Sequence, residues 1–422
     1  MRKNVLFVLF GATILLTMNA CKTELDLDKE LKFSKLTVEE QKAQIEQSGL
    51  DLVTAMEGLQ DTKAMTTLMN MLEMTGGEID YAPMQRLVSD IKNRRQKAFS
   101  NFDKQMRVSY VKSEDEVWGE YKYNFTTDEI ELVKSLTNKL IVSFPASETA
   151  KNNKKNNAVV TVTYEESTVA IPNAEDMDLE EVGIDKYPSK ITFSMTVDGS
   201  EVMSADFSGK YYDDATPKEV KQSLTMETYE WTAEVKNDKK TASESYEFKN
   251  GKTILLKSLA EVKGTLTEDA LNEAIENGGP EDVFKEFAVY AQVMNIAVKG
   301  GTTDFKGFMT EMNAIDYDKL SDKQRTEKEV EILNKYMVCT AFFVDDKRKF
   351  ADVEMYVIED SYEWQQWDNN QQKYVTVTET WYDLALRFIL SDGSKVDVDE
   401  YVMEGFEKFI NKVEDMQNDF DY

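Results

Sequence analysis

Residues 231–262, WTAEVKNDKKTASESYEFKNGKTILLKSLAEV, contain the pattern that decides the fold. Apolar residues recur at every second position, which is the period of a half-buried β-strand. Asn237-Asp238 and Asn250-Gly251 interrupt the alternation, and such pairs favour the short turns that join antiparallel strands. The stretch therefore predicts three consecutive strands of an antiparallel meander. The set expected to face the core from its last strand is Ile254, Leu256, Ala260 and Val262.

The same alternation continues on both sides and indicates one long antiparallel meander over residues 114–265. Asp198-Gly199 adds another hairpin turn, and we expect about nine or ten strands in this part. Helical periodicity replaces the alternation at 37–110 and 266–336, while residues 337–422 contain β-hairpins followed by a helix. The predicted fold is α+β: an open curved sheet or half-barrel packed with helices from the N-terminal, middle and C-terminal segments. From residue 37 onward these parts are expected to form one compact unit.

Helix boundaries are predicted from capping residues and apolar spacing. Thr37 and Glu40 have the spacing of a capping box, which starts the first helix. Gly49 and Gly58 are expected to interrupt that helix. Further helices are predicted over residues 84–106, 267–277, 281–298, 303–313, 321–336 and 401–416, with Gly300-Gly301 ending the one at 281–298.

The first 36 residues indicate where the protein is located. Two basic residues precede Val5–Met18, an apolar run of secretory length that is too short to span a bilayer. Leu16–Cys21 resembles a lipobox, so residues 1–20 are interpreted as a lipoprotein signal peptide and Cys21 as an acylated N-terminus. Two or three acyl chains anchor a protein stably, because each buried CH₂ contributes about 0.8 kcal/mol. The acid-rich residues 21–36 are predicted to be a solvated tether.

Charge and composition exclude several classes of partner and of chemistry. The chain has 50 basic and 79 acidic residues, and its net charge is −29. A surface this negative repels phosphate backbones, so no nucleic acid partner is expected. The absence of histidine excludes Ser-His-Asp and Cys-His catalytic arrangements and imidazole zinc sites. Cys339 lies in an apolar strand and is interpreted as a buried structural thiol.

Motifs for catalysis or cofactor binding are missing from the sequence. It has no Gly-rich phosphate loop, no Gly-x-Ser-x-Gly elbow and no calcium loop, so no catalytic residue, cofactor or metal is predicted. One group of residues is a candidate ligand platform, because aromatic faces beside carboxylates suit the stacking of sugars. Cross-strand packing within a sheet is the alternative interpretation. The group consists of Tyr362, Trp364, Trp367, Asp368 and Tyr374.

Several motifs outside the signal region carry structural rather than chemical information. They are Trp118-Gly119-Glu120-Tyr121-Lys122-Tyr123-Asn124, Ser143-Phe144-Pro145-Ala146-Ser147, Thr196-Val197-Asp198-Gly199 and Leu390-Ser391-Asp392-Gly393-Ser394. Together with the lipobox region, this layout resembles lipoproteins of gut Bacteroidota that have no assigned function. The resemblance implies an outer-membrane lipoprotein at the cell surface or periplasmic face, and it supplies no catalytic residue.

Three functions are compatible with these observations. The leading hypothesis is a non-catalytic lipoprotein, held in the bilayer through acylated Cys21, that binds a glycan or a partner protein. The second is a carrier of lipids or other hydrophobic molecules, with a cavity inside a half-barrel. The third is a glycoside hydrolase with two carboxylates, because that chemistry needs no histidine.

Overall fold

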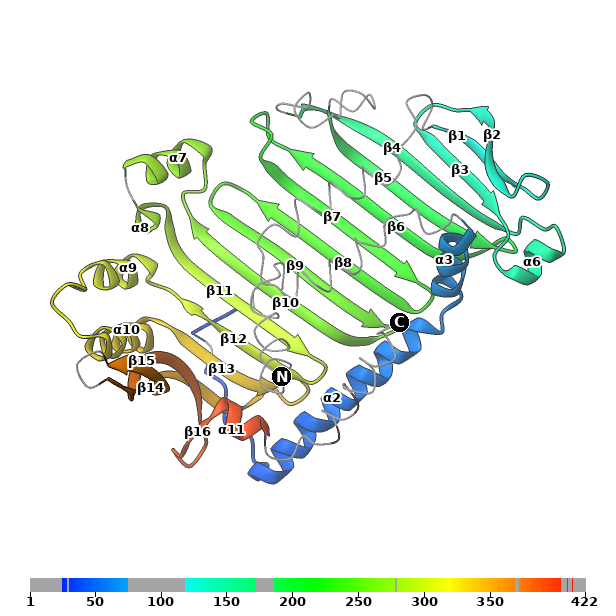
Figure 1. Cartoon of the computed structure of the whole chain (residues 1–422). Coiled ribbons are helices and arrows are strands. Elements are labelled where there is room, and N and C mark those ends of the chain that lie inside the picture. The colour runs from blue at the N-terminus through cyan, green and yellow to red at the C-terminus, as the bar shows by residue number, and fades with distance from the viewer. Residues whose placement is uncertain are drawn as a thin grey trace.

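The computed structural model of this chain describes residues 25–28, 30–74, 118–171, 186–277, 279–368 and 372–403, together with Lys408 and Lys412. Sixteen strands form one open, mostly antiparallel sheet, with helices from the N-terminal, middle and C-terminal segments (Figure 1). The predicted fold class is confirmed. From β3 to β16 the order of strands in the sheet follows the chain, and β1 and β2 lie outside β3.

The strands are β1 (Gly119–Asn124), β2 (Glu129–Ser135), β3 (Lys139–Phe144), β4 (Ala158–Ala170), β5 (Lys186–Val197), β6 (Ser200–Tyr211), β7 (Pro217–Met226), β8 (Tyr229–Asn237), β9 (Thr241–Asn250), β10 (Thr253–Gly264), β11 (Phe284–Val293), β12 (Ile296–Thr302), β13 (Val338–Phe343), β14 (Arg348–Asp368), β15 (Lys373–Ile389) and β16 (Lys395–Asp397). The helices are α2 (Val38–Gln60), α3 (Lys63–Met74), α6 (Glu148–Asn152), α7 (Glu268–Asn277), α8 (Pro280–Val283), α9 (Phe305–Asn313), α10 (Asp322–Tyr336) and α11 (Val398–Met403).

The turns expected from the sequence join strands where they were predicted. Strands β1 to β10 lie in the stretch for which about nine or ten strands were expected. Asp198-Gly199 connects β5 to β6, and both residues have positive φ, 52° and 80°. Gly251, between β9 and β10, has a φ of 58°. These left-handed conformations match the twist of the strands that they connect.

The two faces of the sheet differ in chemistry, because side chains alternate between them along each strand. We call one of them the helix face, since α2 and α3 pack against it in the main hydrophobic core. We call the other the polar face. Strand pairing aligns one row across the helix face, Phe193, Ala205, Leu224, Trp231, Phe248 and Leu256. The neighbouring row on the polar face is Thr192, Asp206, Ser223, Thr232, Glu247 and Lys257.

Helix α2 begins with the predicted capping box and is longer than expected. The Thr37 side chain accepts from the backbone N–H of Glu40, and the Glu40 carboxylate accepts from the backbone N–H of Thr37. The helix runs without interruption through Gly49 and Gly58, so the predicted breaks at these glycines are wrong. At Gly58 a Cβ would lie 2.7 Å from the Tyr229 hydroxyl, so glycine allows the helix to approach the sheet closely.

The core face predicted for β10 is wrong at Ile254, because the strand contains a β-bulge. Ile254 pairs with Lys249 and Leu256 pairs with Phe248, which leaves Leu255 as an extra residue. Ile254 and Leu256 therefore lie on opposite faces, whereas the uniform alternation placed them on the same one. Leu255 is 1% exposed and belongs to the main core, while Leu256 is half-buried at its margin.

The helix predicted over 281–298 is wrong, because only its first residues are helical, in α8. Residues from 284 onward form the hairpin of β11 and β12. Their apolar residues fit both the helical and the strand period, and pairing with β10 over nine register positions decides between them. Met294 turns the chain with a φ of 51°, although methionine is not a residue that signals such a turn. Gly301 does not end a helix: a Cβ there would lie 2.1 Å from the carbonyl oxygen of Phe287 on the neighbouring strand.

The predicted solvated tether is also shorter than expected. Leu25 is 9% exposed and packs with Leu259 and Phe342 on the polar face. Lys299 Nζ donates to the Asp26 carbonyl at 2.6 Å, and the backbone N–H of Ser34 donates to the Lys349 carbonyl at 2.7 Å. The apolar residues between the acids dock this segment on the sheet.

The remaining helix predictions agree with the structure where it describes them. The helices expected at 267–277, 303–313 and 321–336 correspond to α7, α9 and α10. The C-terminal helix begins at Val398, three residues earlier than expected, and most of its predicted length after 403 lies outside the described residues. The signal peptide, Cys21 and the helix at 84–106 lie outside them as well.

Candidate functional site

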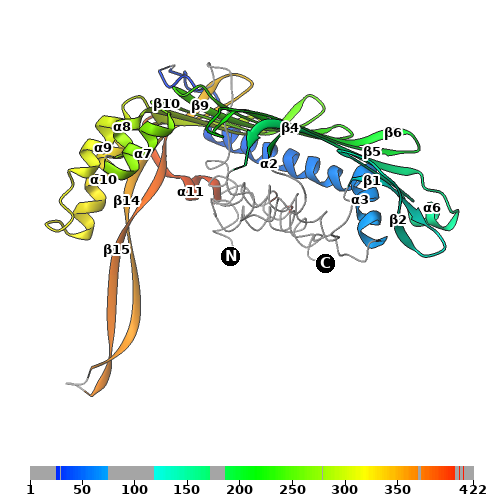
Figure 2. The ribbon, with the colours of Figure 1, turned by 90° about the horizontal axis from the view of Figure 1, so that it is seen from above.

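Strands β14 and β15 extend beyond the sheet as a two-stranded ribbon (Figure 2). We define the ribbon as residues 356–368 and 373–385, which pair with one another throughout. Strand β13 pairs with β14 only as far as Asp352, and β16 pairs with β15 only from Arg387 onward. Among the strands that the structure describes, none pairs with either edge of the ribbon. One edge carbonyl near the base, that of Tyr382, accepts from the Thr326 hydroxyl of α10 at 3.3 Å. Between this contact and the tip, the backbone edges are available to a partner.

Side chains at the base of the ribbon hold it to the body of the protein. The Asn334 side chain of α10 forms two hydrogen bonds with the Met355 backbone: Nδ2 donates to the carbonyl at 2.7 Å, and Oδ1 accepts from the N–H at 2.8 Å. Glu354 pairs with Arg387 and, at 2.7 Å, with Lys395. Burial of Glu354 favours a higher pKa, but the hydrogen bonds from the two cations lower it overall. The base is thus anchored by directional contacts.

The predicted ligand platform is divided between the two faces of the ribbon. Register and alternation place Tyr362 and Trp364 on one face, where their rings stack with centroids 6.0 Å apart and an interplanar angle of 20°. Trp367 and Tyr374 pair across the strands on the opposite face, at 5.2 Å and 70°. Asp368 is the last residue of β14 and pairs with Lys373; its side chain lies outside the part of the chain that the structure describes. The five residues therefore do not form one ledge.

A sixth residue, which the sequence analysis did not include, completes the face of Tyr362 and Trp364. Trp381 pairs with Asp360 and lies on the same side, and its side chain is 37% exposed. Tyr362 is 60% exposed. The signal for Trp381 was the alternation along β15, which becomes informative once the hairpin register is known. We call this surface the aromatic face; it comprises Ile358, Tyr362, Trp364, Val375, Val377 and Trp381.

Acidic side chains accompany the aromatic face. Asp360, Glu379 and Asp383 share this side by register, and no ion pair is found for them in the described part of the chain. Lys373, at the tip, is the one lysine on the ribbon's strands. On the opposite face, the Glu359 carboxylate accepts a hydrogen bond from Tyr382, which raises the pKa of Tyr382. The aromatic face thus combines apolar contact area with a net negative charge, because Lys373 shares this side at the tip while three carboxylates lie along it.

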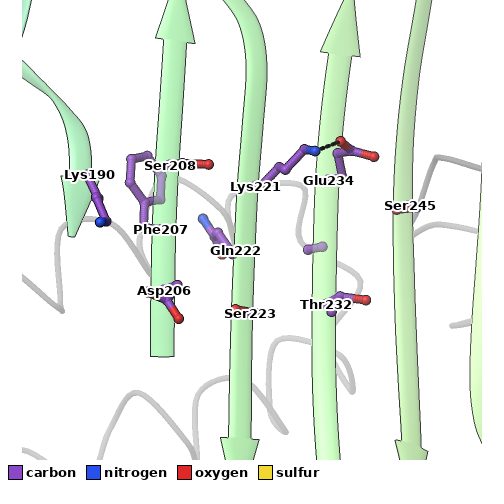
Figure 3. Close-up of a pocket in the computed structure, with 11 residues that line it drawn as sticks. Lys190, Asp206, Phe207, Ser208, Lys221, Gln222, Ser223, Thr232, Glu234 and Ser245 are labelled. Carbon is purple, nitrogen blue, oxygen red and sulfur yellow. Dashed lines mark ion pairs between the residues drawn. The ribbon is translucent and has the colours of Figure 1, made fainter. Parts of the chain in front are cut away.

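The polar face of the sheet contains a shallow hollow of about 390 Å³ over β5 to β9 (Figure 3). Four ion pairs cross it or border it: Lys210 to Glu219 at 2.6 Å, Lys221 to Glu219 at 3.1 Å, and both Lys221 and Lys236 to Glu234 at 2.9 Å. The hydrogen bonds from Lys210 and Lys221 lower the pKa of Glu219 to about 2. These charges compensate one another, so the hollow is a solvated ion-pair network rather than a reactive centre.

One carboxylate lies on the apolar helix face. Glu244 occupies the row of Val235 and Ala260, and burial raises its pKa. Tyr246, next on the same face, has its pKa raised to about 12, mainly by burial. Neither hollow described here lies beside this carboxylate, since the second, of about 270 Å³, lies next to residues 25–28 on the polar face.

Burial raises the pKa of the half-buried Cys339 thiol to about 12, consistent with a structural residue. Within the described ranges, no group of three or more Cys, Asp or Glu residues is arranged to hold a metal ion. No helix within those ranges is long and apolar enough to cross a membrane.

Comparison with known proteins gives no further assignment. No family model matches the chain, and no curated protein or solved structure matches it either.

Proposed function

We propose that this protein is a non-catalytic outer-membrane lipoprotein, anchored through acylated Cys21, that binds a partner protein with its projecting ribbon. The observation that carries the proposal is the ribbon itself: its edges toward the tip pair with no described strand, it bears exposed aromatic side chains, and hydrogen bonds and ion pairs hold its base. Contact surfaces between proteins are enriched in tryptophan and tyrosine, and free strand edges are used for β-augmentation. The partner is expected to be basic, because the aromatic face bears Asp360, Glu379 and Asp383.

A protein partner is favoured over a glycan because of how the rings are arranged. A sugar stacks on a broad ring face, whereas Trp367 and Tyr374 meet edge to face and Tyr362 stacks on Trp364. Aromatic rings on both faces of the ribbon suit a partner that contacts both faces. The carrier and hydrolase alternatives have no comparable observation in the described part of the chain.

The anchor is tested by Cys21→Ser, with Cys339→Ser as the matched control. Loss of the acylated thiol should release Cys21→Ser from the membrane fraction, while Cys339→Ser should remain bound. Equal membrane association of the two variants would contradict the proposed anchor.

The binding surface is tested by placing a photo-crosslinking amino acid at Trp381 in intact cells. Position Thr378 is the control, because it lies on the same strand but on the opposite face of the ribbon. We expect one protein adduct from position 381 and little from 378, and the adduct should weaken in a Tyr362→Ala background. No adduct at 381, or equal adducts at both positions, would contradict the proposal.

A further inference from the structure

The N-terminal segment leaves the folded body from the polar face of the sheet. Leu25 contacts the cluster of Leu259, Tyr290, Ala297 and Phe342, all of which face that side by register. Lys299 is only 5% exposed and binds the Asp26 carbonyl, so the segment covers it. The segment lies on one side of the sheet and the ribbon projects from the other side (Figure 2).

The proposed anchor lies very close to this contact in the sequence. Three residues, Lys22, Thr23 and Glu24, separate Cys21 from Leu25. Even fully extended, the four steps between their Cα atoms span at most about 14 Å. An acylated Cys21 would therefore hold the polar face near Leu25 within about 14 Å of the lipid interface.

The charges of the polar face allow such an approach. After loss of residues 1–20 the chain has 48 basic and 79 acidic residues, a net charge of 48 − 79 = −31. Strand positions on the polar face from Asp206 to Lys263 are balanced, with six lysines and six acids. They are Lys210, Lys221, Lys236, Lys249, Lys257 and Lys263, with Asp206, Glu219, Glu230, Glu234, Glu247 and Glu261. An anionic bilayer repels this surface less than the rest of the molecule.

We infer that the polar face is the membrane-facing side of the anchored protein and that the ribbon points away from the bilayer. The inference rests on the proposed acylation of Cys21. From Ile358 to Asp368 the ribbon adds eleven residues, or roughly 35 Å at about 3.3 Å per residue. The aromatic face is thus presented beyond the lipid headgroups, where a partner anchored elsewhere can reach it.

Energy transfer to labelled lipids tests this orientation. The acylated protein with Cys339→Ala has no free thiol once Cys21 is a thioether, so one introduced cysteine accepts a donor dye. Ser245→Cys lies on the polar face opposite Leu259, and Thr378→Cys lies on the ribbon. In phosphatidylethanolamine–phosphatidylglycerol vesicles with an acceptor on the headgroup, transfer from position 245 should be several-fold higher than from 378. Equal transfer, or the reverse order, in membrane-bound protein would overturn the orientation alone.

Variants of the tether provide the controls. A Gly-Ser spacer of about 20 residues inserted before Leu25 keeps its packing but lengthens the link, so transfer from position 245 should fall. Leu25→Asp should have the same effect by releasing the segment, while exposed Asp28→Asn should leave transfer unchanged. Unchanged transfer with the spacer would contradict the short-tether argument. Protein that stays out of the vesicles and has a free Cys21 thiol would refute the anchor, and with it this inference.

Discussion

Truncation of two adjacent leucines tests the bulge in β10 and the register of the central sheet. Leu255→Ala removes a side chain that is 1% exposed and packed in the main core, whereas Leu256→Ala removes one that is half-buried. The lost alkyl groups correspond to about 2.4 kcal/mol of transfer free energy at about 0.8 kcal/mol per CH₂. A closed cavity at 255 brings the total to about 3 to 5 kcal/mol, while about 1 kcal/mol is expected at 256, where solvent or neighbours fill the space.

Urea unfolding of the non-acylated mature chain measures this difference, with tryptophan fluorescence as the signal. Trp231 is a suitable reporter because its ring stacks on Phe248 at 4.3 Å, within the same core. Lys257→Ala is the control: its side chain lies on the polar face, 4.0 Å from Glu247, and its loss should cost less than about 0.5 kcal/mol. If Leu256→Ala costs as much as Leu255→Ala, the extra residue lies elsewhere and the assigned register is wrong.

Three further predictions concern single side chains. Glu244→Gln should raise the free energy of unfolding at neutral pH, because burial lifts the folded-state pKa of Glu244 above the ordinary value of 4.5. The stability that the neutral carboxyl provides is complete below pH 4.5 and is lost as the pH rises through the folded-state pKa. The gain should vanish in urea titrations at about pH 4, and a pH-independent gain would contradict this account. Cys339 should resist alkylation in the native state and react after unfolding, because burial raises its pKa to about 12; rapid native labelling would show an accessible thiolate. Asn334→Ala should speed deuterium exchange in residues 355–368 without affecting β5 to β10, and unchanged exchange would show that the amide does not hold the ribbon.

The antiparallel meander was predictable because its signals are local. Asp198-Gly199 and Asn250-Gly251 define hairpins through backbone conformations that few residues adopt, and alternation between them identifies the strands. The hairpin at Met294 gave no such signal, and its apolar spacing also fits a helix. The bulge at Leu255 gave no sequence signal either. Leu255 and Leu256 are both apolar, so the alternation along β10 is compatible with either of them facing the core.

The candidate site was predicted only in part, because it depends on pairing between distant residues. Sequence proximity grouped Trp364 with Trp367, but three residues along a strand place side chains on opposite faces. Trp381 is far from both in sequence and joins the face of Trp364 only through the register. The docking of the segment before α2 was hidden by its acids, since Leu25 and Ser34 are buried among charged neighbours.

Helix α2 has a consequence for the order in which the molecule can be completed. A sheet whose strands follow the chain order can grow strand by strand, each new strand needing only its predecessor. Helix α2, however, contributes Ile45 to the cluster that contains Phe343 and Phe388, and Leu52 and Leu59 to the core that contains Met195. Helix α2 is synthesised early, but some of its packing contacts come from β13 and β15, which are synthesised late. A chain truncated before β13 would leave one end of that helix without its partner surface, so assembly should be completed only when the C-terminal strands are present.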